Sequence, residues 1–190
     1  MASVFEVLSR DHEQVKRMLA ELEKGPTAAA GAGQRQLALR EEMVEQLIIA
    51  ASRHEAAEEM FFWPVVHEQQ HTGHLLAEAA VQQEQDGKQL LQRLGQASPG
   101  QPDFEDLLAQ FTQAARDHIL FEETSVWPGL KASLSEPDAA ALGRRLELAR
   151  KVAPSMPHPR VPASPALLRG AGPVIAAADR VRGAVNRRRS

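Results

Sequence analysis

Apolar residues recur at alternating steps of three and four along several long stretches of the 190-residue chain. This spacing places side chains on one face of an α-helix, so each stretch predicts a helix with one buried side. The first helix is expected to begin near Val4, because Ser3 and Glu6 are spaced as a capping box. Its apolar positions are Val4, Leu8, Val15, Leu19 and Leu22, and His12 fills the gap between them.

Four more helices are predicted from the same pattern, at about residues 34–63, 73–94, 103–127 and, shorter, 135–152. Proline has no backbone N–H and disfavours a helical residue before it, so we expect Pro64 and Pro128 to end the second and fourth helices. Short loops join the long helices. The pattern therefore predicts an all-α protein, an up-down-up-down four-helix bundle with a short fifth helix and a flexible tail.

The character of the chain changes after residue 152. Residues 153–190 hold six of the 12 prolines, and residues 150–190 hold nine Lys or Arg against one acid, Asp179. The preceding 149 residues keep 13 basic and 24 acidic side chains, so an acidic body precedes a basic tail. We divide the chain into a domain at 1–152 and a Pro-rich linker with a basic, solvated tail at 153–190, in which a short helix could form at 174–185. Two alternatives stay open, since the tail could bind nucleic acid or an anionic surface, or fold back onto the acidic body.

Composition removes several classes of chemistry. The chain has no Cys, which excludes disulfides, thiolate metal ligands and cysteine nucleophiles. It has no Tyr and only 6 Phe and 2 Trp, although 43% of its residues are apolar. This composition suits packed helices better than strands. No apolar stretch approaches the roughly 18 residues of a membrane span, and the first residues do not resemble a secretion signal. We therefore expect a cytoplasmic protein.

The second and fourth predicted helices carry the same motif, 64 residues apart. The matching sets are His54, Glu58, Glu59, Trp63, Pro64 and His118, Glu122, Glu123, Trp127, Pro128. The first and third helices match at an offset of 72, which pairs Lys16 with Lys88 and His12 with Glu84. We interpret the chain as a doubled helical hairpin.

Six polar residues of this repeat fall on faces that are predicted to be buried. The second helix has Leu47, Ala51, His54, Glu58, Phe61 and Val65 on its face, and the fourth has Leu107, Phe111, Ala115, His118, Glu122 and Ser125. His12 and Glu84 hold equivalent positions in the first and third helices. The layer lies near the middle of the bundle.

A lone His-x-x-x-Glu pair is usually a solvated pair on a helix surface. Here three His and three Glu converge in one apolar layer, with no Lys or Arg on the same faces. Burying an ionised carboxylate costs several kcal/mol, and a purely structural bundle would not keep three of them. Buried charges must be paired or coordinate metal, so the layer predicts a metal site.

Imidazole and carboxylate ligands without sulfur suit iron or manganese better than zinc. The repeat indicates two metals that share Glu58 and Glu122. His12 and His54 would complete the ligands of the first metal, and Glu84 and His118 those of the second. The predicted ligands are therefore His12, His54, Glu58, Glu84, His118 and Glu122.

On these residues the chain resembles the hemerythrin-like HHE cation-binding family, in particular bacterial members with a Pro-rich, basic C-terminal extension. The resemblance covers residues 1–150 and rests on His12, the two His-Glu-Glu motifs and the repeated Trp-Pro pairs. It implies a non-haem di-iron centre, two iron ions with a bridging oxo or hydroxo group and manganese as the alternative, that binds or reacts with O2, H2O2 or NO. The resemblance makes the three histidines terminal ligands and Glu58 and Glu122 the bridges.

The third helix departs from the family pattern. Oxygen-carrying hemerythrins place two histidines one turn apart there, where this chain has Ala80 and Glu84. Fewer imidazoles and an added carboxylate favour the ferric state and a second open coordination position. We therefore expect catalase-like or oxidase chemistry in oxidative-stress defence, with an oxygen, NO or redox sensor that signals through its tail as the alternative. Glu84 either ligates or points away, leaving its place to water.

Other candidates receive simpler interpretations. Glu59 and Glu123 are expected beside the centre without being ligands, and Trp63 and Trp127 as buried indoles at helix ends. Three further histidines follow the second helix, His67, His71 and His74. We interpret them as a solvated turn, with a surface metal cluster as the alternative.

Overall fold

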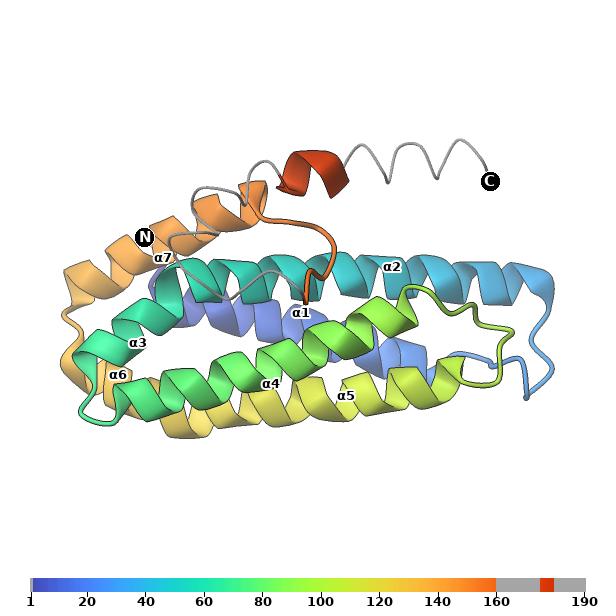
Figure 1. The fold of residues 1–190 in the computed structure, drawn as a ribbon, viewed down its shortest axis with the longest axis horizontal. Coiled ribbons are helices and arrows are strands. Elements are labelled where there is room, and N and C mark those ends of the chain that lie inside the picture. The colour runs from blue at the N-terminus through green and yellow to red at the C-terminus, as the bar shows by residue number, and fades with distance from the viewer. Residues whose placement is uncertain (1, 160–174, 180–190) are drawn as a thin grey trace.

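Four long helical segments lie side by side and alternate in direction, which confirms the predicted all-helical bundle (Figure 1). The computed structural model describes residues 2–159 and 175–179. None of the helices in this part of the chain is both long and apolar enough to cross a membrane. The two hairpins of the bundle are built on α1 (Val4–Lys24) with α2 (Gln34–Ala57) and on α4 (Gly73–Leu94) with α5 (Phe104–Phe121).

Serine caps start the first and the last helix of the domain. The Ser3 hydroxyl accepts from the Glu6 N–H at 3.3 Å, and the Ser3 N–H donates to the Glu6 carboxylate at 2.7 Å, as the predicted capping box requires. Ser135 caps α7 (Glu136–Val152), the predicted fifth helix, by accepting from the Asp138 N–H. α7 packs against α1 and α2 and runs along one side of the bundle, from the end where α3 and α6 lie (Figure 1).

The predicted ends of the second and fourth helices are wrong. Each chain segment passes through a five-residue π-helix, η1 (Glu58–Phe62) or η2 (Glu122–Val126), and continues as α3 (Trp63–Gln69) or α6 (Trp127–Ser133). Pro64 and Pro128 occupy the first turn of these new α-helical segments. A missing N–H costs no hydrogen bond there, so the prolines do not end the helices.

The π-turns also shift the buried face of each helix by one residue. The sequence pattern predicts Phe61 and Val65 inside, but Phe62 and Val66 are fully buried and Phe61 and Val65 only partly. After the second motif the predicted Ser125 is exposed, and its neighbour Val126 is buried. A π-turn accommodates one residue more than an α-turn, so every position after it rotates to the next place on the face.

The apolar interior is divided into two clusters with a polar layer between them. One contains Leu8, Phe62, Trp63, Val66 and Leu130 together with residues of α7. The other contains Leu19, Leu47, Leu91, Phe104 and Phe111. The clusters hold the four segments together on both sides of the layer, so the polar side chains within it have little freedom to move toward solvent.

Parts of the predicted tail pack on the bundle. Asp179 is 3% exposed, and its carboxylate accepts from the N–H groups of Ser155 and Met156 at 3.1 and 3.2 Å and lies 3.1 Å from the His158 ring. The Gln85 side chain of α4 donates to the Pro159 carbonyl. Residues 153–159 and the helical residues 175–179 therefore differ from the solvated tail expected. The rest of the 153–190 region, and of the short helix predicted at 174–185, lies outside the described residues, and the domain boundary stays a prediction.

We expect Asp179→Ala to loosen the attachment of residues 155–158 to the helical residues 175–179. Loss of the buried acceptor removes two charge-assisted hydrogen bonds, so amide hydrogen exchange at Ser155 and Met156 should accelerate by about tenfold or more. The matched control is Ala177→Ser, at an exposed position in the same helical turn. Unchanged exchange in Asp179→Ala would show that other contacts hold the segment.

Candidate metal centre

The six predicted ligands meet in one buried layer between the two apolar clusters. Their side-chain ligand atoms form two groups of four, within each of which all atoms lie within 4.8 Å of one another. The first group is His12, His54, Glu58 and Glu122, and the second is Glu58, Glu84, His118 and Glu122. Each of the six residues is at most 9% exposed. The structure brings together the residues expected of two metal positions that share two carboxylates, and their role as ligands stays a prediction.

The three imidazoles direct Nε2 toward the shared carboxylates. Nε2 of His54 lies 3.1 Å from Glu58 Oε2. Glu122 faces both groups, with Oε1 2.8 Å from His118 Nε2 and Oε2 3.3 Å from His12 Nε2. An oxygen on each side is the placement that a bridging carboxylate needs.

The shared carboxylates stand at the first residues of the π-turns, Glu58 in η1 and Glu122 in η2. His54 and His118 lie four residues earlier, in the last turn of α2 and α5, so each pair remains on one helix face. Single π-turns inside α-helices are rare and concentrate at functional sites. Here each His-x-x-x-Glu pair keeps its α-helical spacing, because the π-turn begins at the Glu. The Trp-Pro pair that follows is rotated about the helix axis.

Several buried atoms of the layer have no hydrogen-bond partner among the described residues. They are both carboxylate oxygens of Glu58 and Glu122, one oxygen of Glu84, and Nε2 of His12 and His118. Buried polar groups are normally paired, and each unpaired one calls for an explanation. Together with the His54 imidazole, these groups make up a set of three imidazoles and three carboxylates, a donor set that fits iron or manganese.

Burial and neighbouring charges shift the pKa values of the three carboxylates in different directions. Burial, reinforced by the Glu122 and Glu84 carboxylates, raises the pKa of Glu58 well above its ordinary value, and burial together with Glu59 does the same to the pKa of Glu84. Glu122 is as deeply buried, but the imidazoles of His118 and His12 outweigh its burial and hold its pKa below the ordinary value. Bound cations would favour the charged form of all three.

Glu59 and Glu123 lie beside the centre without belonging to either four-residue group, as expected. Glu123 accepts from His12 Nδ1 at 2.9 Å and pairs with Lys16 at 3.1 Å. Glu59 pairs with Lys88, and both of these side chains are buried. The offsets of 72 and 64 residues relate Lys16 to Lys88 and Glu123 to Glu59, so the two ion pairs are counterparts in the doubled hairpin.

The two indoles are buried, as predicted, but they also contact ligand positions. Trp63 Nε1–H donates to the Glu84 carboxylate. The Trp127 ring stacks on the His12 imidazole, with centroids 5.2 Å apart and planes 13° from parallel. His12 and Glu84 are repeat counterparts, and each is held by the tryptophan of the other hairpin.

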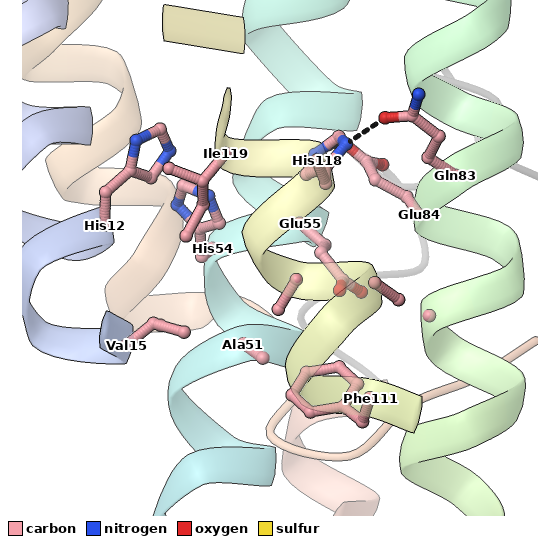
Figure 2. Close-up of a pocket in the computed structure, with 13 residues that line it drawn as sticks. His12, Val15, Ala51, His54, Glu55, Gln83, Glu84, Phe111, His118 and Ile119 are labelled. Atoms are coloured by element: carbon pink, nitrogen blue, oxygen red, sulfur yellow. Dashed lines mark hydrogen bonds and ion pairs between the residues drawn. The ribbon is translucent and has the colours of Figure 1, made fainter. Parts of the chain in front are cut away.

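A cavity of about 30 Å³ opens beside the layer, with room for a molecule the size of water (Figure 2). His12, His54 and His118 lie along its polar side, and Phe111 forms part of its apolar wall. Glu55, the residue after His54 in α2, also lines the cavity. The cavity admits only a small ligand.

Among the buried groups near the centre that sequence reasoning missed are Glu55 and Lys88. Glu55 is 7% exposed, and one of its oxygens has no hydrogen-bond partner among the described residues. Lys88 reaches the interior and places a cation beside the layer, although it is not on the predicted inner face. The sequence did offer one signal for Lys88. It lies four residues after Glu84, as its repeat counterpart Lys16 lies four residues after His12.

The three histidines that follow the second motif, His67, His71 and His74, are exposed. The His67 and His74 rings lie 6.4 Å apart between centroids. Among the described residues, none of the three belongs to a group with metal-binding spacing.

Comparison with known proteins supports the cation site. A model of the hemerythrin HHE cation-binding domain matches residues 3–130, a range that contains all six predicted ligands and stops before α7. Among solved structures, a hemerythrin HHE cation-binding domain-containing protein from Mycobacterium kansasii is similar, with a TM-score of 0.66 and 18% sequence identity over 94% of this chain and 99% of that one. At this identity the likeness concerns the fold alone. No curated protein matches the chain.

We expect the metal-free protein to lose stability as pH rises from about 5 to 8. Burial raises the pKa of Glu55 from 4.5 to about 8. The folded state therefore keeps a proton that the unfolded state releases, and the free energy of unfolding falls as pH rises through this window. Glu55→Gln, which stays neutral, should flatten the dependence of Tm on pH.

The raised pKa values of Glu58 and Glu84 act in the same direction, so some slope should remain in Glu55→Gln. The control is Glu78→Gln, at an exposed position of α4. A slope in Glu55→Gln as steep as that of the control would mean that Glu55 ionises like a solvated carboxylate.

Proposed function

Because the chain belongs to the hemerythrin HHE cation-binding domain family, we propose that its cation site is a non-haem di-iron centre. The observation that carries this proposal is the pair of four-residue groups that share Glu58 and Glu122. The proposed ligands are His12, His54, Glu58, Glu84, His118 and Glu122. Manganese suits the same imidazole and carboxylate donors and is the alternative metal.

The proposed activity is reaction with peroxide or oxygen, in defence against oxidative stress. Two bound irons supply two-electron redox chemistry toward H2O2 or O2. The residues support this use over oxygen carriage, because the group around His118 contains one imidazole and three carboxylates. Anionic oxygen ligands favour the more highly charged ferric ion. The small volume of the cavity beside the layer suits small ligands such as O2, H2O2 or NO.

A sensing module is the second candidate, and one contact of the tail favours it. A cavity of about 20 Å³ between tail and bundle is lined by Glu59 and Lys88 on the bundle side and by Pro154 and His158 on the tail side. This ion pair flanks Glu58 and Glu84. A change of charge at the centre would act on Lys88 and Glu59 and through them on the segment that covers them.

We expect the purified parent protein to hold two irons per chain and to show an oxo-bridged charge-transfer band in the visible spectrum. Glu122→Gln removes a carboxylate that both metal positions share, so iron content should fall to one or none per chain. The control Glu78→Gln should keep the parent's content, since this side chain is exposed. A folded parent that takes up no iron or manganese would overturn the proposal.

Peroxide chemistry is expected to appear as oxygen release without added reductant, two H2O2 giving two H2O and one O2. Glu84→Ala removes a ligand from the His118 group only, so it should lose about half of the iron and slow the turnover by about tenfold or more. Full iron content and full turnover in Glu84→Ala would show that Glu84 is not a ligand. Iron-loaded parent that releases no oxygen, but whose residues 153–159 change their protease protection with iron oxidation state, would favour the sensor.

A further inference from the structure

The histidines of the centre need a partner for their second ring nitrogen. A neutral imidazole that binds metal through Nε2 carries its proton on Nδ1, and an acceptor for that proton fixes the ring. His12 Nδ1 has the Glu123 carboxylate at 2.9 Å. His118 Nδ1 has the side-chain oxygen of Gln83 at 2.9 Å.

His54 Nδ1 faces Asp11 Oδ2 at 3.6 Å. The gap is longer than a hydrogen bond, yet both atoms are buried and neither has a hydrogen-bond partner among the described residues. Asp11 is 5% exposed, so its carboxylate is largely shielded from solvent. Asp11 Oδ2 and His54 Nδ1 are therefore two buried atoms of complementary chemistry that face each other, and neither has a competing hydrogen-bond partner in this part of the chain.

The internal repeat gives an independent reason to pair them. Asp11 stands 72 residues before Gln83, and His54 stands 64 residues before His118, the offsets that relate the two hairpins. The Asp11–His54 contact is therefore the counterpart of the Gln83–His118 hydrogen bond. One hairpin uses a neutral acceptor for its histidine, and the other uses a carboxylate.

The Asp11 carboxylate forms an ion pair with an arginine. Arg150 Nη1 lies 2.7 Å from Asp11 Oδ1, and its side chain is 32% exposed. Burying the Asp11 charge without a partner would be costly, whereas Gln83 is neutral and needs none. Arg150 belongs to α7, which packs on α1 and α2 and lies outside the family match at residues 3–130.

We propose that Asp11 and Arg150 are positioning residues of the metal centre, Asp11 for the Nδ1 proton of His54 and Arg150 for the Asp11 carboxylate. This inference rests on the proposed di-metal function and adds α7 to the centre.

The inference also makes the two metal positions unequal. Both histidines of the His12–His54 group face carboxylates, Glu123 and Asp11, and a carboxylate partner makes an imidazole a stronger donor. The His12–His54 position therefore binds metal more tightly and fills first.

The test is a titration of the metal-free full-length protein with Co²⁺, followed by visible absorption. The parent should bind two Co²⁺ per chain in two resolved steps. Asp11→Asn and Arg150→Met should weaken the tighter step by about 10- to 100-fold and leave the weaker step unchanged. Arg150→Lys keeps a cation and should fall between the parent and Arg150→Met, which keeps the test usable where the larger change harms folding.

Two comparisons separate positioning from a structural role. The double variant Asp11→Gln/Arg150→Met copies the neutral arrangement of Gln83 and should recover much of the tighter step relative to Arg150→Met alone. The control Arg10→Met/Glu147→Gln breaks the exposed ion pair, 2.8 Å long, that also joins α1 to α7. It should leave both steps as in the parent.

The outcomes distinguish the two proposals. Parent-like titrations of Asp11→Asn and Arg150→Met would overturn the positioning role while the metal centre stands. Equal weakening of both steps, or the same loss in the Arg10→Met/Glu147→Gln control, would also overturn it, because α7 would then only hold the bundle together. A parent that binds no Co²⁺, iron or manganese would overturn the proposed function and this inference together.

Discussion

The structure depends on the burial of three carboxylates and three imidazoles in one layer of a helical bundle. Glu58, Glu84 and Glu122 are almost inaccessible to water, and most of their oxygens find no donor among the described residues. Such a layer is unfavourable unless cations compensate it. The two apolar clusters hold it in place, since they pack the four helical segments on both sides and prevent the carboxylates from reaching solvent.

The doubled hairpin explains how the layer is built and where its halves differ. The ion pairs Lys16–Glu123 and Lys88–Glu59 are counterparts, and both flank the centre. The tryptophans are counterparts too, but one stacks on an imidazole and the other donates to a carboxylate. The additions to the bundle fall on different sides, with α7 against α1 and α2 and the tail segment over the Lys88–Glu59 pair. A symmetric scaffold therefore carries a centre whose two positions have different surroundings.

The bundle and the grouping of the six polar residues were predictable because helical periodicity depends only on local spacing. Steps of three and four residues put His12, His54 and Glu84 on inner faces whatever the rest of the chain does. The π-turns were not predictable in this way. Pro64 and Pro128 end an ordinary helix by local rules, but here they open a new helical segment after a wider turn. The wider turn rotates the following residues by one position, so Phe62 is buried in the core instead of Phe61.

The sequence by itself determined the helices, their antiparallel order and the composition of the polar layer, because covalent spacing and the helical repeat decide which side chains share a face. Only the tertiary structure decided which groups surround each histidine. Asp11 meets His54 across α1 and α2, and Arg150 reaches Asp11 from α7. Pro154 and His158 line a cavity beside Lys88. These contacts join positions far apart in the chain, and they follow from how the helices pack, which no local pattern specifies.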